Sequence, residues 1–312
     1  MANKEKNFVS AVVYVHNAEK RIEIFLKTII KILEDNFEHS EIICVNDASE
    51  DESLKKIKIS SELADSVNIS VVNMSYFHGL ELSMNAGIDI SIGDFVFEFD
   101  NTVLDFEPNV IMEVYKKALT GFDVVSASAD KKEKLTSKVF YKVFDRYTEF
   151  SYRMTTESFR ILSRRVLNRV DAMNKTVPYR KVIYANCGLK AANIRYEIVN
   201  QVHTVIDKKE KNFRTNLAMD SLILFTEMGY SLSRTMTILM MIISVFTLIY
   251  SVVIYITSNP VAGWTTTILF LAVAFFGLFA ILTVVIKYLQ LLVNLVFKRA
   301  QYSFESIEKL TK

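Results

Sequence analysis

Polar side chains with oxygen ligands follow three apolar segments in the first hundred residues. Asn17 follows the first segment, Asp47 the second and Asp100 the third. Carboxylate and amide oxygens accept hydrogen bonds from polar ligands, and carboxylates also bind metal ions. The pattern predicts a polar binding site wherever the fold brings these three positions together.

The apolar segments alternate with helical patterns. The short runs that predict buried strands are 8–15, 41–45, 67–72 and 95–99. Between them, apolar spacing predicts a helix with Asn17 as its N-cap and another helix over 80–90. Strands alternating with helices predict an α/β fold with a doubly wound, mostly parallel sheet. In such sheets ligands bind beyond the carboxyl ends of the strands, where the three polar positions fall.

Three motifs in this region carry a family resemblance. Residues 45–53 (VNDASEDES) resemble the V-(N/D)-D-(G/A)-S-x-D-x-(S/T) segment of inverting family 2 glycosyltransferases, whose fold is called GT-A. Residues 14–19 resemble the P-x-Y-N-x-E opening of that family, with Tyr14 in place of the proline. Residues 85–94 resemble the helix before its metal-binding strand.

Four later segments resemble one branch of that family, the enzymes that transfer sugars to polyprenyl phosphates. The branch includes dolichol-phosphate mannose synthases and bactoprenol glucosyltransferases. The matching segments are 135–142, 159–165, 263–266 and 288–302. Their order and spacing over nearly the whole chain, rather than any single motif, make the resemblance specific.

The resemblance implies a nucleotide-sugar donor, a polyprenyl-phosphate acceptor and a divalent cation, Mg²⁺ or Mn²⁺, that neutralises the departing diphosphate. The residues that match the donor site are Asn17, Glu19, Asp47, Ser49, Asp51 and Asn101. Those that match the lipid-phosphate site are Lys131, Lys132, Ser137, Lys138 and Arg160. Asp100 and Thr102 stand where the metal ligands belong, and the catalytic candidates are Asp100 and Asp105.

The chain departs from the family where side chains would touch metal or phosphate. Thr102 replaces the second aspartate of the D-x-D motif, so we expect cation binding to be weak or to require the nucleotide. Only Gly79 survives of an R-N-x-G-K segment, Ala129 replaces an arginine, and Ser158 replaces the acid before F-R-L. Two hypotheses follow: an active glycosyltransferase with an altered site, or a catalytically impaired relative acting as partner or regulator in a cell-surface glycan pathway.

Two charge-free runs near the C-terminus predict a transmembrane hairpin. Residues 235–257 and 265–286 carry no charge over 23 and 22 residues, and each run is long enough for a helix to cross a hydrocarbon core of about 30 Å. The expected parts are a GT-A-like domain, a juxtamembrane amphipathic segment, a two-helix hairpin in the lipid bilayer and a basic tail. Their predicted bounds are 1–207, 208–234, 235–297 and 298–312.

Basic residues flank both outer sides of the predicted hairpin and are absent from its turn at 258–264. By the positive-inside bias, this distribution predicts a multi-pass membrane protein with the catalytic domain and both termini in the cytoplasm. The compact hairpin and the Lys-, Ile- and Phe-rich composition indicate a bacterial protein, and hence an inner-membrane location. The first residues are too polar for a secretory signal peptide. A homo-oligomer and a membrane partner such as a flippase remain open alternatives.

Charge and cysteine content add little to these expectations. The formal net charge is +2, from 37 basic and 35 acidic residues that are mixed along the chain. Nucleic-acid binding is not expected, given the predicted membrane context. Cys44 and Cys187 have neither CxxC nor metal-ligand spacing. In the cytoplasm both are expected to be reduced.

Overall fold

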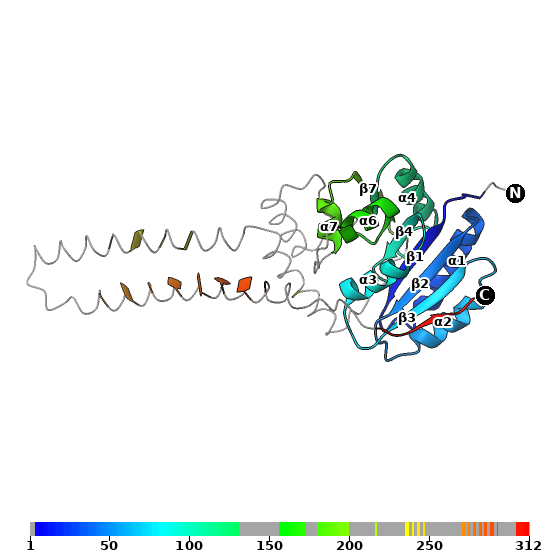
Figure 1. Cartoon of the computed structure of the whole chain (residues 1–312), viewed down its shortest axis with the longest axis horizontal. Coiled ribbons are helices and arrows are strands. Elements are labelled where there is room, and N and C mark those ends of the chain that lie inside the picture. The colour runs from blue at the N-terminus through cyan, green and yellow to red at the C-terminus, as the bar shows by residue number, and fades with distance from the viewer. Residues whose placement is uncertain are drawn as a thin grey trace, which may run out of the picture. The chain divides into compact units, whose positions relative to one another are not determined.

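The computed structural model describes residues 4–130, 156–172, 180–199 and 304–311, with isolated helical positions between 216 and 292. The chain divides into two compact units, one formed by Met1–Leu217 with Ala300–Lys312 and the other by Ala218–Arg299. The first unit contains an α/β domain, which confirms the α/β part of the predicted fold class (Figure 1).

Strands and helices alternate along most of this domain. The strands are β1 (Val9–Val15), β2 (Ser40–Asn46), β3 (Asn68–Met74), β4 (Phe95–Phe99), β5 (Val124–Ala129), β6 (Phe159–Ser163), β7 (Ala191–Tyr196) and β8 (Phe304–Lys309). The helices are α1 (Ile22–Asn36), α2 (Ser53–Ser61), α3 (Leu80–Ile90), α4 (Asn109–Leu119), α6 (Arg164–Ala172) and α7 (Arg180–Asn186).

The strands form one sheet in the order β7-β5-β6-β4-β1-β2-β3-β8. Pairing is parallel between β1 and β2, β1 and β4, β2 and β3, and β5 and β7. It is antiparallel where β6 joins β4 and β5, and where β8 joins β3. The sheet is therefore mixed, with the predicted parallel part at its centre. The central order β4-β1-β2 places the carboxyl ends that carry Asp100, Asn17 and Asp47 next to one another.

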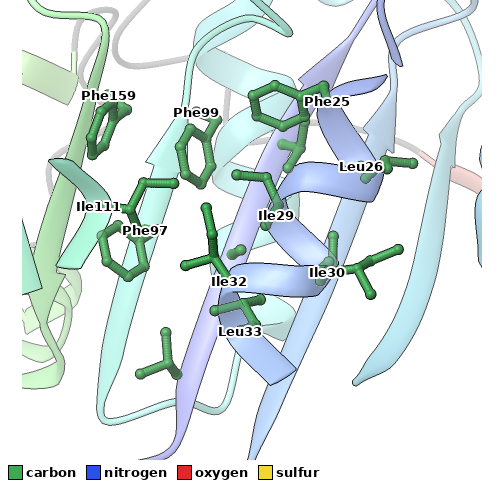
Figure 2. Close-up of a cluster of buried hydrophobic side chains, with 14 of the residues drawn as sticks. Phe25, Leu26, Ile29, Ile30, Ile32, Leu33, Phe97, Phe99, Ile111 and Phe159 are labelled. Carbon is green, nitrogen blue, oxygen red and sulfur yellow. The ribbon is translucent and has the colours of Figure 1, made fainter. Parts of the chain in front are cut away.

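Helices cover both faces of the sheet because its central strands are apolar on both sides. Val9, Ala11 and Val13 of β1 pack with α1, α2 and α4, whereas Val12 and Tyr14 pack with α3, α6 and α7. Figure 2 shows the first face, where one side of α1 lies against phenylalanines of β4 and β6. Each fully buried Phe, Leu or Ile side chain contributes about 1.5–3 kcal/mol to such a core.

Gly87 explains how close α3 lies to the sheet. A Cβ atom at this position would lie 2.5 Å from Cγ1 of Val12 and 2.6 Å from Cγ2 of Val45. Only glycine lets the backbone of this helix approach both strands so closely. The helix therefore presents its first turn to the carboxyl end of the sheet, where Gly79 precedes Leu80 with φ of 81°.

Asn17 is not the cap that the sequence predicts. Helix α1 begins at Ile22 with Arg21 as its N-cap, and Asn17 lies four residues earlier with φ of 47°. This left-handed backbone is uncommon for residues other than glycine, although asparagine tolerates it better than most. Asn17 therefore shapes the loop after β1 instead of starting the helix.

The predicted juxtamembrane segment (208–234) and hairpin (235–297) lie outside the described residues, apart from isolated positions. Within the described part of the chain, no helix combines the length and apolar character needed to span a membrane. The predicted tail is corrected: Phe304–Lys309 is not a separate basic tail but the edge strand β8 of the sheet. Its pairing with β3 depends on contacts more than 230 residues apart, for which local sequence carries no signal.

Candidate functional site

The loops after β1 and β2 interlock at the carboxyl end of the sheet. The backbone N–H of Asn17 donates to Oγ of Ser49 (3.1 Å), and the N–H of Glu50 donates to Oδ1 of Asn17 (2.9 Å). Ala48 in the second loop also has a left-handed backbone, with φ of 50°. Reciprocal hydrogen bonds thus hold two strained positions in one arrangement.

Asp51 and Glu19 extend this contact. Oδ2 of Asp51 accepts from the N–H of Glu19 (2.9 Å), and Oε2 of Glu19 accepts from the N–H of Glu52 (3.2 Å). Burial raises the pKa of Asp51, but hydrogen bonds from Ser53 and Glu19 outweigh it and leave the pKa below its usual value. The carboxylate therefore stays ionised at neutral pH. Four of the predicted donor residues, Asn17, Glu19, Ser49 and Asp51, meet in this cluster.

Two other predicted donor residues lie outside that cluster. Asp47 is fully buried, and its carboxylate accepts from Tyr14 Oη (2.9 Å), the N–H of His78 (2.8 Å) and the N–H of Gly79 (2.8 Å). It therefore fixes the loop before α3. Asn101 follows β4, where its Oδ1 accepts from the N–H of Val103 (2.8 Å). Contact of either residue with a nucleotide stays a prediction.

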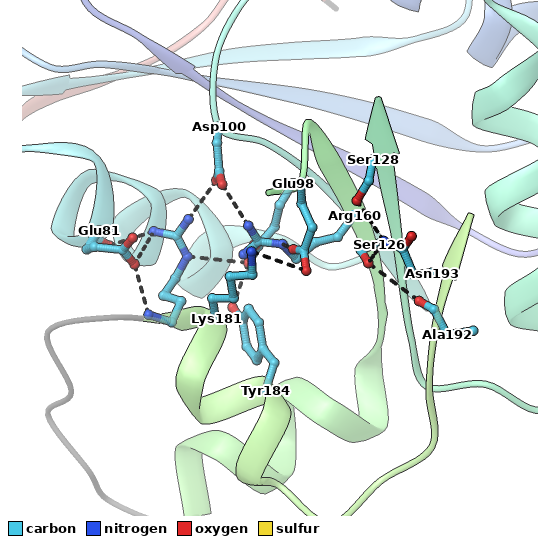
Figure 3. A network of polar contacts seen from close by, with 12 residues as sticks. Glu81, Glu98, Asp100, Ser126, Ser128, Arg160, Lys181, Tyr184, Ala192 and Asn193 are labelled. Carbon is cyan, nitrogen blue, oxygen red and sulfur yellow. Dashed lines mark hydrogen bonds and ion pairs between the residues drawn. The ribbon is translucent and has the colours of Figure 1, made fainter. Parts of the chain in front are cut away.

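Asp100 is held by two buried arginines. Its Oδ2 accepts from Arg160 of β6 at 2.7 Å, and its Oδ1 accepts from Arg180 of α7 at 2.9 Å (Figure 3). Arg160 is 3% exposed and Arg180 is 2% exposed. Both oxygens of the predicted catalytic carboxylate are therefore engaged by guanidinium groups.

The two arginines belong to a larger buried network. Glu98 of β4 is fully buried and accepts from Arg160 (2.9 Å) and from Tyr184 Oη (2.6 Å). Arg160 also donates to Glu157 (3.1 Å). Among the described residues, the charged members are the carboxylates of Glu81, Glu98, Asp100 and Glu157 and the cations of Arg160, Arg180 and Lys181.

Burial and ion pairing oppose each other in this network. Burial lowers the pKa of Arg160, but Asp100, Glu98 and Glu157 more than offset it and leave the pKa raised. Burial raises the pKa of Glu81 even though Arg180 acts in the opposite direction. Charges withdrawn from water this completely are tolerated only when they are paired and hydrogen-bonded.

The predicted metal ligands do not fit a bound cation as they lie. Both oxygens of Asp100 face guanidinium groups, and the hydroxyl of Thr102, a residue only 3% exposed, has no hydrogen-bond partner among the described residues. A hydroxyl also brings no negative charge to a cation. No group of three or more His, Cys, Asp or Glu side chains in the described ranges could hold a metal ion.

Asp105, the second catalytic candidate, has a different set of partners. Its Oδ1 accepts from Tyr196 Oη (2.7 Å), and the same hydroxyl contacts Oγ of Ser158. Ser158 stands where the family resemblance implies an acid. The hydroxyl of Tyr196 therefore connects the carboxylate of Asp105 to Ser158.

The predicted lipid-phosphate residues are only partly testable. Lys131, Lys132, Ser137 and Lys138 lie outside the described residues. Arg160 is described, and its position does not fit contact with a lipid phosphate, because the guanidinium is buried against Glu98, Asp100 and Glu157.

Three members of this buried network were not predicted from the sequence: Glu98, Arg180 and Tyr184. Glu98 carried a usable signal, because a carboxylate inside the apolar strand 95–99 must meet a cation or a hydrogen-bond donor. Arg180 and Tyr184 carried none. They lie 80 and 86 residues from Asp100 and Glu98, in a short helix that no motif marks.

Comparisons with known proteins bear on the family and the fold of this chain. A family model described as glycosyl transferase family 2 matches residues 10–171, which is just over half of the chain. An uncharacterized glycosyltransferase of Synechocystis sp. is 29% identical over 195 residues, covering 61% of this chain and 60% of the relative. The chain thus spans less than two thirds of that protein.

Two further relatives match over more of their length. The uncharacterized glycosyltransferase YkcC of Bacillus subtilis is 24% identical, covering 83% of this chain and 81% of the relative. A prophage bactoprenol glucosyl transferase homolog of Escherichia coli is 26% identical, covering 70% of this chain and 72% of the relative.

A solved structure supports the fold. Glucosyl-3-phosphoglycerate synthase from Mycobacterium tuberculosis, in complex with Mn²⁺, UDP-glucose and phosphoglyceric acid, matches with a TM-score of 0.50 and 14% identity. The match covers 70% of this chain and 79% of that one. At this identity the likeness concerns the fold alone, and it supports a GT-A-like mixed sheet.

Proposed function

Because the chain belongs to glycosyl transferase family 2, we propose that it transfers a sugar from a nucleotide-sugar donor to a polyprenyl phosphate, with inversion at the sugar carbon. The proposed acceptor is supported by relatives named bactoprenol glucosyl transferase, which are 24–27% identical to this chain. The proposed donor is supported by the interlocked loops after β1 and β2.

The observation that carries the proposal is the cluster of Asn17, Glu19, Ser49 and Asp51 at the carboxyl ends of adjacent parallel strands. This edge is where open α/β sheets bind nucleotides. An ionised Asp51 suits the hydroxyl groups of a ribose. The acceptor phosphate is already an anion, so its reaction requires placement next to the sugar more than loss of a proton.

The proposal includes no catalytic step through a divalent cation. Mg²⁺ or Mn²⁺ would be held by Asp100 and Thr102, and neither side chain fits that role in the described arrangement. Cation binding that is weak, or that requires the nucleotide, stays a prediction.

A second candidate function is favoured by the same contacts. If Arg160 and Arg180 keep Asp100 engaged, the chain is a catalytically impaired family member that acts as a partner or regulator in a cell-surface glycan pathway. The substitutions at 102, 129 and 158 and within 76–80 also support this alternative.

A transfer assay separates the two candidates. Purified protein is incubated with a panel of radiolabelled nucleotide sugars and undecaprenyl phosphate, and labelled lipid is extracted and counted. We expect transfer from at least one donor, and we expect Asp51→Ala to raise KM for that donor about tenfold, the effect of losing one charge-assisted hydrogen bond. The matched control is Asp65→Ala, an aspartate outside the cluster. No transfer from any donor favours the non-catalytic candidate.

We also propose that the chain lies in a bacterial inner membrane, with the catalytic domain and both termini in the cytoplasm. This proposal is supported by the charge-free runs and by the basic residues outside them. A cysteine introduced at Ser258 should react with an impermeant reagent in intact cells, whereas a reporter fused after Lys312 should be cytoplasmic. The opposite labelling pattern would reverse the topology.

A further inference from the structure

The C-terminal strand β8 lies at the edge of the sheet, next to β3 (Figure 1). Register pairs Asn46 of β2 with Asn73 of β3, and Asn73 with Ser306 of β8. A row of polar side chains therefore crosses three strands at the end of the sheet that carries the loops of the candidate site. One residue earlier on each strand, the paired residues of β2 and β3 are apolar, Val45 and Val72.

Side-chain hydrogen bonds connect the residues of this row, and each asparagine amide donates on one side and accepts on the other. Nδ2 of Asn73 donates to Oγ of Ser306 (3.1 Å) and to Oε1 of Glu308 (3.3 Å). Oδ1 of Asn73 accepts from Nδ2 of Asn46 (3.0 Å). Each amide group uses its nitrogen on one side and its oxygen on the other, so the orientation of Asn73 also determines that of Asn46.

The row ends in the loop after β2. Oδ1 of Asn46 accepts from the N–H of Ser49 (3.2 Å), and Ser49 in turn accepts from the N–H of Asn17. These contacts hold the segment in which Ala48 has positive φ. Glu308 makes a further contact at 2.6 Å with Lys58 of α2, the helix that follows this loop. Strand β8 therefore contacts the start of the loop 46–53 through Asn73 and Asn46, and it contacts α2, which follows that loop, through Lys58.

A buried amide pair is an expensive way to stabilise a sheet. Asn46 and Asn73 are both buried, and a buried amide costs free energy unless its hydrogen bonds are satisfied. Apolar residues would pack there without that requirement. What the amides supply is directional: they specify one orientation of the loop amide at Ser49.

We propose that β8 positions the donor-binding loop, with Asn73 as the positioning residue that transmits its contact to Ser49. When Ser306 and Glu308 are in place, the loop 46–53 keeps the conformation that receives the nucleotide. When they are lost, the loop becomes more mobile and nucleotide affinity falls. This inference rests on the proposed function, because it assigns the nucleotide to that loop.

The test uses the full chain with UDP, GDP and dTDP as probes in titration calorimetry. We expect Asn73→Ala, and separately Ser306→Ala combined with Glu308→Ala, to weaken binding of the preferred nucleotide about fivefold to tenfold, the effect of losing one buried hydrogen bond. Glu308→Gln keeps an acceptor for Asn73 but loses the ion pair with Lys58, so affinity should be retained. The matched control on the same strand is Lys309→Ala.

Hydrogen exchange provides a second readout that does not depend on the nucleotide. In Asn73→Ala, and in Ser306→Ala combined with Glu308→Ala, the backbone amides of 46–53 should exchange faster than in the wild type. Exchange of the backbone amides of α1 should not change. Unchanged exchange at 46–53 in both variants overturns the inference, as does unchanged affinity where the wild type binds. A wild type that binds no nucleotide contradicts the proposed function instead, and the exchange data then still decide whether β8 orders the loop.

Discussion

Replacing Arg160 with methionine should lower the free energy of unfolding by about 3–5 kcal/mol, the usual cost of removing one partner from a buried ion pair. Methionine keeps most of the side-chain volume, so little of this loss arises from packing. The loss arises because Glu98 and Glu157, whose side chains are almost fully buried, lose a guanidinium at 2.9 Å and 3.1 Å. Urea unfolding of purified protein, followed by circular dichroism, measures the effect.

The matched control is the same substitution at Arg165. This arginine also pairs with an aspartate, Asp123, but its side chain is 67% exposed, so water replaces the lost contact and the effect should be much smaller. Adding Glu98→Gln to Arg160→Met should recover part of the stability, because it removes one of the buried carboxylates that lose their contact with Arg160. Equal losses at 160 and 165 would contradict the buried network.

A change at Thr102 should have the largest effect on metal binding. Without nucleotide, wild-type protein should leave the electron paramagnetic resonance signal of free Mn²⁺ unchanged at micromolar concentrations, because Asp100 is engaged by Arg160 and Arg180. Thr102→Asp adds a carboxylate at a buried position whose hydroxyl has no hydrogen-bond partner in the described part of the chain. It should strengthen Mn²⁺ binding about tenfold or more, since affinity follows the charge of the ligands.

Thr120→Asp is the control for this experiment, because it adds the same charge at an exposed residue at the end of α4. Melting curves would verify that Thr102→Asp is folded. Tight Mn²⁺ binding by the wild type would show that Asp100 leaves its arginines readily, which favours the enzyme. If the wild type transfers no sugar and Thr102→Asp alters neither metal binding nor transfer, the non-catalytic candidate is favoured.

The strand and helix pattern of the first hundred residues could be predicted from the sequence. Buried parallel strands are apolar on both faces, so β1, β2, β3 and β4 stand out as short apolar runs. Helix α3 agrees with its predicted bounds. Because parallel strands end at the same edge, the placement of Asn17, Asp47 and Asp100 near one another followed from this pattern.

What each polar residue does at that edge was decided by tertiary structure. The sequence predicted Asp47 as a donor-site residue, and the structure adds that its carboxylate is buried under Tyr14 and the backbone of His78 and Gly79. Asp100 read as a metal ligand, yet Arg160 and Arg180 take up its oxygens. In both cases the partner comes from a distant element, and a carboxylate binds the nearest donors whatever their separation along the chain.

Strand β8 likewise separates what local sequence predicts from what tertiary contacts decide. Local sequence determined where apolar periodicity begins and ends, because that depends on neighbours along the chain. It could not place β8 beside β3, because an antiparallel edge pair is chosen by backbone hydrogen bonds and by contacts such as those of Asn73 with Ser306 and Glu308. The unpaired N–H and C=O groups of a strand edge accept many partner strands, so long-range contacts rather than local sequence select the one that pairs there.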